Sequence, residues 1–256
     1  MFTLVTKNQI EIVFHSFLES KSMKDLTSND HFILLGDIFD FWRIKNANAI
    51  LEKENEDILQ KLIKISSRTN MYYIIGNHDY SIINLYNRYG RNYFPFQVLK
   101  NLRLEDNENK FFFTHGYELE VFSSLEPLTI ADYEYISEML CDRTGGFTGE
   151  VISKLWDSIK SSTKLLKNSK IYSILKPPKE RLDMTKIDKF CRSIPARSMF
   201  LGMKENEYLI FGHTHWPLLE NESKVANSGS WIKYDKDYNS YLLIEDGIIE
   251  QKFWEQ

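Results

Sequence analysis

The chain has 256 residues, of which 43% are apolar and 14% aromatic, so it can bury a sizeable core and is not a disordered protein. Asp and Glu (36) slightly outnumber Lys and Arg (32), and the net charge of −4 gives no general attraction to nucleic acids or anionic membranes. The two cysteines, Cys141 and Cys191, form no Cys-x-x-Cys motif, which favours buried free thiols over a disulfide framework.

Short apolar runs typical of β-strands alternate with helical patterns, which predicts an α/β fold. In chain order, the predicted strands are 32–35, 72–75, 110–113, 208–211, 224–226, 241–244 and 248–254. Between the first two runs, residues 49–69 have the periodicity of a helix that covers one face of a sheet. A strand, helix, strand unit of this kind predicts that the first two strands are parallel.

Strand patterns stop between residues 117 and 203, where helices are predicted over 129–140, 148–166 and 183–191. No repeat, linker or low-complexity segment marks a boundary, so we predict one domain over residues 1–256, with 117–203 as a helical insertion within it. Next to the helix breakers Pro177 and Pro178, the insertion contains Lys160, Lys164, Lys167, Lys170, Lys176 and Lys179. A solvated basic face is the simpler interpretation, and a cap that attracts an anionic substrate is the alternative.

Candidate metal ligands follow four of the predicted strands at the point where each apolar run ends. The four motifs are Gly36-Asp37-Ile38-Phe39-Asp40, Gly76-Asn77-His78-Asp79, His115-Gly116 and Gly212-His213-Thr214-His215. In α/β sheets the carboxyl ends of strands are where ligands bind. Asp, Asn and His without Cys suit Mn²⁺, Fe or Zn²⁺, so we predict a site for one or two divalent ions, with Mn²⁺ as the first choice.

In this order and spacing, the four motifs resemble the calcineurin-like metallophosphoesterase superfamily. The segment Asn227-Ser228-Gly229-Ser230-Trp231 resembles a strand-end motif of the same superfamily. Residues 36–42 and the helical insertion most resemble UDP-2,3-diacylglucosamine hydrolases. The resemblance implies a four-layer sandwich of two mixed β-sheets flanked by helices, in which the insertion caps the metal crevice.

The resemblance also implies which residues hold the metal. Asp37 would bridge two ions, and one of these ions would be completed by Asn77, His115 and His213. His215 would bind the second ion.

Three further residues receive roles beside the metal. His78 would act as a general acid at the scissile phosphate, and Asp79 would orient its ring. Asp40 would support the site from the second layer of residues or cap the following turn.

The chain departs from the superfamily at its N-terminus, where no Asp-x-His motif occurs. In one interpretation residues 1–5 are the first strand and Lys7 and Gln9 replace the two ligands, which predicts a one-metal enzyme or an inactive relative. In the other, residues 9–18 are the helix that follows the Asp-x-His loop, so the ligand strand would lie upstream of Met1. The sequence leaves both open.

The leading hypothesis is a metal-dependent hydrolase that cleaves a phosphodiester or diphosphate bond, with UDP-2,3-diacylglucosamine as a model substrate. The alternative is a catalytically weak or inactive binding protein with the same fold. We expect a small-molecule or lipid-linked phosphate partner rather than a nucleic acid, because the pI is about 5.9 and Arg is not interleaved with aromatic residues.

The expected location is the cytoplasm, because no apolar run reaches the roughly 20 residues of a spanning helix. A lipid-linked substrate would add peripheral membrane contact. Some apolar residues of the insertion could line an acyl chamber, although core positions are favoured: Val121, Phe122, Leu125, Leu128, Ile130, Trp156, Leu165 and Leu166.

Overall fold

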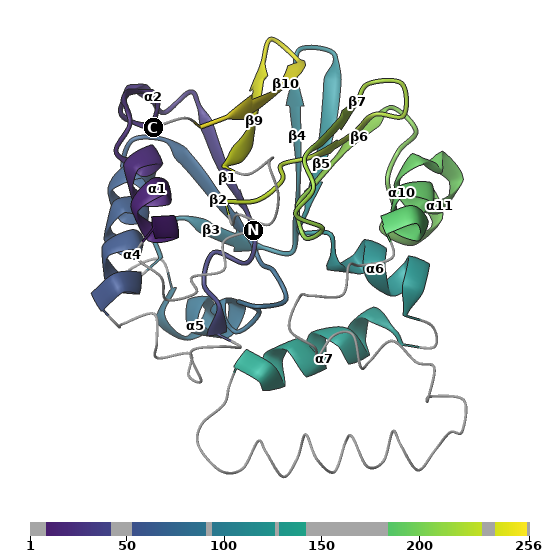
Figure 1. Cartoon of the computed structure of the whole chain (residues 1–256), viewed down its shortest axis with the longest axis horizontal. Coiled ribbons are helices and arrows are strands. Elements are labelled where there is room, and N and C mark those ends of the chain that lie inside the picture. The colour runs from purple at the N-terminus through teal and green to yellow at the C-terminus, as the bar shows by residue number, and fades with distance from the viewer. Residues whose placement is uncertain are drawn as a thin grey trace.

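The computed structural model of the chain describes residues 9–41, 53–90, 94–125, 128–141, 184–231 and 239–254 (Figure 1). Its helices are α1 (Gln9–Leu18), α2 (Lys21–Asp25), α4 (Lys53–Ser66), α5 (Ile82–Tyr89), α6 (Tyr117–Ser124), α7 (Ile130–Cys141), α10 (Met184–Arg192) and α11 (Ile194–Leu201). Its strands are β1 (His31–Leu35), β2 (Asn70–Ile74), β3 (Gln97–Leu99), β4 (Asn101–Asp106), β5 (Asn109–Thr114), β6 (Glu207–Phe211), β7 (Leu218–Glu220), β8 (Val225–Asn227), β9 (Ser240–Glu245) and β10 (Ile248–Phe253).

All the strands that the apolar runs predict are present, as β1, β2, β5, β6, β8, β9 and β10. The predicted helices over 49–69, 129–140 and 183–191 correspond to α4, α7 and α10, and residues 9–18 form α1. The predicted helix over 148–166, the lysine-rich segment and the proposed first strand at 1–5 lie outside the described residues.

The strands form three hydrogen-bonded sheets within the described residues. β1, β2 and β3 are parallel, which confirms the predicted parallel pairing of the first two apolar runs. A five-stranded sheet has the order β4-β5-β6-β8-β7, with parallel pairs at its centre and antiparallel pairs at both edges. β9 and β10 form an antiparallel ribbon.

The layers follow from the alternation of side chains along the strands. On β1, Phe32 and Leu34 belong to a cluster that includes α1 and α4, whereas Ile33 and Leu35 pack against the five-stranded sheet. The other face of the five-stranded sheet packs against α6 and α10. Figure 1 shows the same order, with helices outside and two sheets between them. The predicted α/β fold is therefore confirmed, although the described strands form three sheets where two mixed sheets were expected.

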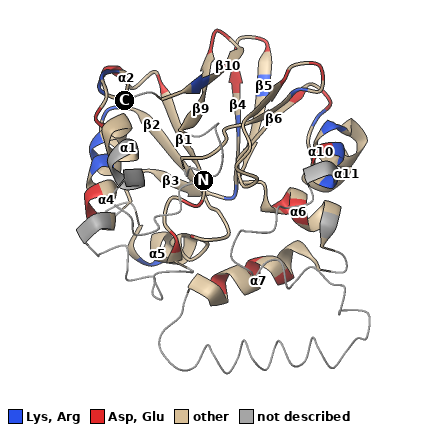
Figure 2. Cartoon of the chain, viewed as in Figure 1, with Lys and Arg blue, Asp and Glu red and all other residues tan. Residues whose placement is uncertain are grey.

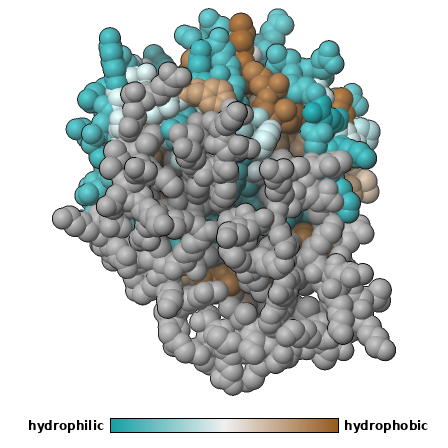
Figure 3. All heavy atoms as spheres, in the orientation of Figure 1, coloured by the Kyte–Doolittle hydropathy of each residue, from teal (hydrophilic) through white to brown (hydrophobic). Residues whose placement is uncertain are grey.

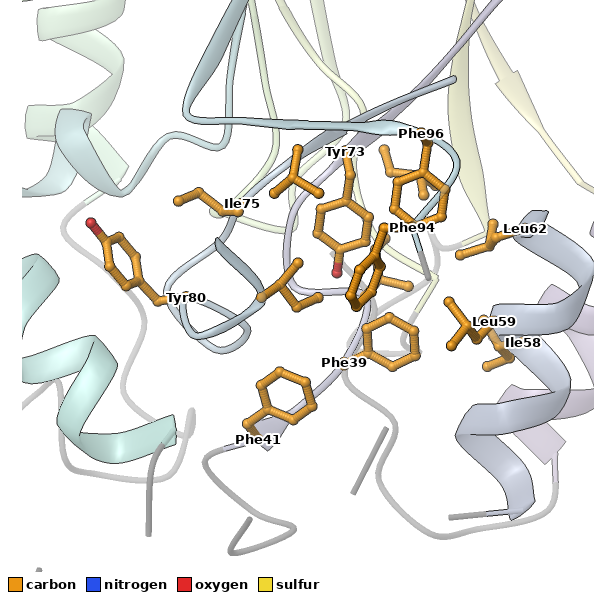
Figure 4. Close-up of a cluster of buried hydrophobic side chains, with 14 of the residues drawn as sticks. Phe39, Phe41, Ile58, Leu59, Leu62, Tyr73, Ile75, Tyr80, Phe94 and Phe96 are labelled. Atoms are coloured by element: carbon orange, nitrogen blue, oxygen red, sulfur yellow. The ribbon is translucent and has the colours of Figure 1, made fainter. Parts of the chain in front are cut away.

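A largely aromatic cluster fills the space between the three-stranded sheet and α4 (Figure 4). Phe39, which follows β1, stacks on Tyr73 of β2 with the ring centroids 6.4 Å apart. On the α4 side, Ile58 and Leu62 are almost wholly buried. Burial of large rings and aliphatic side chains stabilises this half of the fold and fixes the loop after β1, which carries Asp37.

The described part of the insertion, residues 117–125, 128–141 and 184–203, contains helices and no strand. Val121 and Leu125 are buried in the main core, which confirms the core interpretation for these two side chains. Trp156, Leu165 and Leu166 lie outside the described residues. Cys141 and Cys191 are free and buried, as predicted.

Hydrophilic residues cover most of the described surface on the face in Figure 3, with a hydrophobic band near the top of the view. Within the described ranges, no helix is both long and apolar enough to cross a bilayer. Figure 2 shows that the charges on α6 and α7 are acidic, since neither helix contains Lys or Arg.

Candidate metal centre

The predicted ligands lie together at the carboxyl ends of four strands. Asp37 follows β1 and Asn77 follows β2, while His115 follows β5 and His213 follows β6. The two sheets are joined at this edge, because His115 Nδ1 lies 2.6 Å from the carbonyl oxygen of Leu35, at the end of β1. The Gly212 amide in turn donates to the His115 carbonyl at 2.9 Å, which brings the β6 end alongside the β5 end.

The backbone is strained at the candidate ligands. Asp37, His213 and His215 have φ angles of 54°, 56° and 63°, in the left-handed region that side chains disfavour. Each such residue costs on the order of 1–3 kcal/mol, and strain of this kind gathers at functional sites. The strained backbone is therefore independent support for a binding site at these strand ends.

Glycine allows the two loops after β1 and β2 to approach closely. A Cβ atom on Gly76 would lie 2.0 Å from Asp37 Oδ1, and one on Gly36 would lie 2.6 Å from His115 Nδ1. Both contacts are far shorter than packed atoms tolerate, so no larger residue fits at either position without displacing Asp37 or His115.

Asp37, His115 and His213 form a buried group whose candidate ligand atoms all lie within 4.8 Å of one another. His115 Nε2 is 3.3 Å from Asp37 Oδ2 and 3.2 Å from His213 Nδ1. Asn77 Oδ1 lies 3.1 Å from the same His115 nitrogen. The structure thus brings together four of the five residues predicted as ligands.

The hydrogen bonds around this group leave lone pairs facing one another. His115 Nδ1 is directed at the Leu35 carbonyl and His213 Nε2 lies 2.9 Å from Glu120 Oε2, so these nitrogens carry the ring protons when both rings are neutral. His115 Nε2 and His213 Nδ1 then present lone pairs to each other. Asp37 Oδ2 is buried and has no hydrogen-bond partner. A cation resolves this arrangement, and the nitrogen and oxygen donors fit a divalent metal ion.

The charges of the site are strongly coupled. Burial by itself would raise the pKa of Asp37, but the neighbouring rings of His115 and His78 hold the pKa of this carboxyl well below its usual range. Burial opposes a charged His115 ring, yet the Asp37 carboxylate raises the pKa of His115 above its ordinary value. Asp37 therefore stays ionised, as a metal ligand must.

His215 does not belong to the group formed by Asp37, His115 and His213. Burial lowers its pKa well below the ordinary value, which favours the neutral ring that can bind a metal. The Asn227 side chain donates to the Gly212 carbonyl at 2.7 Å and to the Thr214 hydroxyl at 2.8 Å, and so holds the loop that carries both His213 and His215. A second metal ion at His215 stays a prediction.

Asp40, and not Asp79, contacts the ring of His78. Asp40 Oδ1 lies 2.9 Å from His78 Nδ1, and the Asp40 side chain is fully buried. The prediction that Asp79 orients this ring is therefore wrong. The parallel pairing of β1 with β2 places the loops that follow them at the same edge of the sheet, which brings the distant Asp40 beside His78.

Asp79 instead links the loop after β1 to the loop after β2. Its carboxylate accepts hydrogen bonds from the Gly76 amide at 2.7 Å, from the Ile38 amide at 2.8 Å and from the Tyr73 hydroxyl. Burial, together with the charge of Asp37, raises the pKa of Asp79 to about 6. Asp79 thus acts on the site through the backbone that holds Asp37 and Asn77.

Replacing Asp79 with alanine is expected to lower the free energy of unfolding by roughly 2–5 kcal/mol, because two buried amides lose their acceptor. Urea denaturation of the metal-free protein measures the change. Asp57→Ala, on the exposed side of α4, is the control and should stay within about 0.5 kcal/mol of wild type. A stability for Asp79→Ala equal to that of the control would contradict the linking role.

Glu120 is a residue of the site that the sequence analysis missed. Its carboxylate lies against His213 Nε2, and its side chain is only 5% exposed. The available signal was a pair of glutamates, Glu118 and Glu120, in an otherwise apolar helical segment just after His115. That signal points to His213 only when the direction of α6 relative to β6 is known.

The comparisons with known proteins agree with the site. A family model described as calcineurin-like phosphoesterase matches residues 10–217, well over half of the chain and all four strand-end motifs. A search of curated proteins returned no match. The strand-end ligands, the buried donor group and this match together show that the chain belongs to the calcineurin-like phosphoesterase family, whose members are metal-dependent hydrolases of phosphate esters.

Proposed function

We propose that the protein hydrolyses a phosphodiester or diphosphate bond in a small nucleotide-linked or lipid-linked substrate, with Mn²⁺ as its first-choice metal. The observation that carries the proposal is the buried group of Asp37, His115 and His213, with Asn77 beside it, next to the paired His78 and Asp40.

A divalent cation at this group would supply Lewis-acid activation of the phosphoryl centre and of water. The protein's own residues do the positioning. The His78 backbone amide donates to Asp37 Oδ1 at 2.8 Å, which holds the backbone of His78 close to the metal ligands. Since Asp40 engages Nδ1, His78 would give a proton to the leaving oxygen through Nε2.

The charge around the site supports a diester over a monoester. α6 and α7 both contact the site, through Glu120 at His213 and through the Cys141 thiol at the His78 carbonyl, 3.3 Å away. These helices carry acidic residues and no basic ones (Figure 2). A monoester phosphate carries close to two negative charges, of about −1.5 to −2, and a diester carries one, so the acidic surroundings repel the monoester more strongly.

The test compares four substrates with the Mn²⁺-loaded protein: bis-p-nitrophenyl phosphate, UDP-2,3-diacylglucosamine, a nucleoside diphosphate sugar without acyl chains, and p-nitrophenyl phosphate. We expect hydrolysis of at least one diester or diphosphate, its loss on chelation and its return with Mn²⁺, with slower turnover of the monoester. Preference for the monoester would overturn the proposed bond type. A loaded protein that hydrolyses none of the four would favour the non-catalytic alternative.

A further inference from the structure

Glu120 is a buried carboxylate that faces the ring of His213. Its Oε2 atom lies 2.9 Å from His213 Nε2, and burial, together with the charge of Glu120, raises the pKa of the Tyr133 hydroxyl of α7 well above its ordinary value. Tyr133 is itself buried and stacks on Tyr117 of α6, with the ring centroids 5.5 Å apart and the planes at 9°. Glu120 therefore lies in a buried, partly aromatic environment beside α7, with its carboxylate directed at the His213 ring.

The two histidines of the group are supported in different ways. The remote nitrogen of His115 faces a neutral backbone carbonyl, that of Leu35, whereas the remote nitrogen of His213 faces a carboxylate. A carboxylate at this position selects the ring proton on Nε2, fixes the ring plane and makes the Nδ1 lone pair a stronger donor. With Asp37, it also brings a second negative charge to the buried group, which matches the charge of a divalent ion.

Helix geometry separates Glu120 from Glu118, the other acidic residue in the first turns of α6. Residues two apart on a helix do not share a face. Glu118 turns back along the chain and accepts hydrogen bonds from the Thr114 hydroxyl at 2.8 Å and from the Gly116 amide at 3.2 Å. Both glutamates are buried near the start of one helix, where acidic residues are generally favourable, but only Glu120 reaches a member of the metal-binding group.

We propose that Glu120 is a positioning residue that orients His213 and strengthens its Nδ1 atom as a metal donor. The inference rests on the proposed metal-dependent function, because it concerns how the metal of that same site is held. It assigns to α6 a direct part in metal affinity, in addition to its packing role.

The experiment titrates Mn²⁺ into metal-free protein and follows unbound Mn²⁺ by electron paramagnetic resonance, with no substrate present. We expect the Mn²⁺ dissociation constant of Glu120→Ala to rise about 10- to 100-fold, which is the usual effect of losing a partner behind a histidine ligand. Glu120→Gln keeps an acceptor without the charge, so a smaller rise is expected. The matched control Glu118→Gln should bind Mn²⁺ as wild type does.

A second readout separates positioning from general stability. Nitrogen-15 spectra of the metal-free imidazoles at about pH 8, where an ordinary histidine is neutral, report which nitrogen of His213 carries the proton. Wild type and Glu120→Gln should show the proton on Nε2, and Glu120→Ala a mixture of both forms. If Glu120→Ala does not fold, Glu120→Gln decides through its dissociation constant.

Wild-type affinity in a folded Glu120 variant, or an equal loss in Glu118→Gln, would overturn the inference. Failure of the proposed function looks different. In that case the wild type binds Mn²⁺ but cleaves none of the test substrates, and the affinity ratio between the variants still reports on Glu120.

Discussion

Asp37→Asn is expected to weaken metal binding at the centre severely and, with it, hydrolysis. The amide is as large as the carboxylate, and its oxygen can still accept the His78 amide that now donates to Oδ1. The opposite atom becomes an N–H donor in place of Oδ2, which lies 3.3 Å from His115 Nε2 and has no hydrogen-bond partner. An N–H group at this position would hydrogen-bond to the lone pair of His115 Nε2, and that lone pair would no longer be available to a cation.

The expected loss is large because removing one member of a buried charged set costs about 3–5 kcal/mol, or about 10²- to 10⁴-fold in the Mn²⁺ dissociation constant. Mn²⁺ titration measures the constant, and turnover of bis-p-nitrophenyl phosphate should fall at least as far. Asp57→Asn, on the exposed side of α4, makes the same chemical change away from the site and should alter neither quantity. Wild-type Mn²⁺ affinity in Asp37→Asn would contradict the assignment.

His78→Ala is expected to slow hydrolysis by about 10²- to 10⁴-fold, the range typical of general acid catalysis, while the metal stays bound. The His78 ring is not part of the group formed by Asp37, His115 and His213, and its Nδ1 atom is engaged by Asp40. The loss should therefore appear in kcat and leave the Mn²⁺ dissociation constant unchanged.

Comparing two leaving groups tests directly whether His78 transfers a proton. A p-nitrophenolate departs without a proton, whereas an alkoxide of high pKa needs one, so the deficit of His78→Ala should be larger for an alkyl diester than for bis-p-nitrophenyl phosphate. An equal deficit for both esters would remove the proton-transfer role. Loss of bound metal in this variant would show instead that His78 is a ligand.

The strand-end motifs could be predicted from the sequence because they combine buried apolar runs with polar residues that have no place in a core. Four ligands at four strand ends meet once the strands are parallel, and the parallel pairing of β1 with β2 follows from the helix between them. For the same reason, the predicted bounds of β6 are close to those of the structure and differ from them by only one residue.

Strands β3 and β4 have too weak a local sequence pattern to be predicted. β3 has only the residues Gln97–Leu99, and β4 (Asn101–Asp106) alternates Leu102 and Leu104 with polar and charged side chains, so neither resembles an apolar run. β4 gains its stability from pairing with β5, which no local pattern reveals. The partner of His78 was misassigned for a related reason, because adjacency in the chain favoured Asp79 and only the sheet brings Asp40 to the ring.

Elemental analysis of metal per chain shows whether the buried group of Asp37, His115 and His213 holds a metal ion. The protein is purified with Mn²⁺, freed of loosely held ions and analysed beside Asp37→Asn. We expect at least one tightly held metal ion per wild-type chain, two if His215 belongs to a second site, and loss of the ion held at Asp37, Asn77, His115 and His213 in the variant. A folded wild-type protein that retains no metal, or a variant that retains as much as wild type, would contradict this expectation.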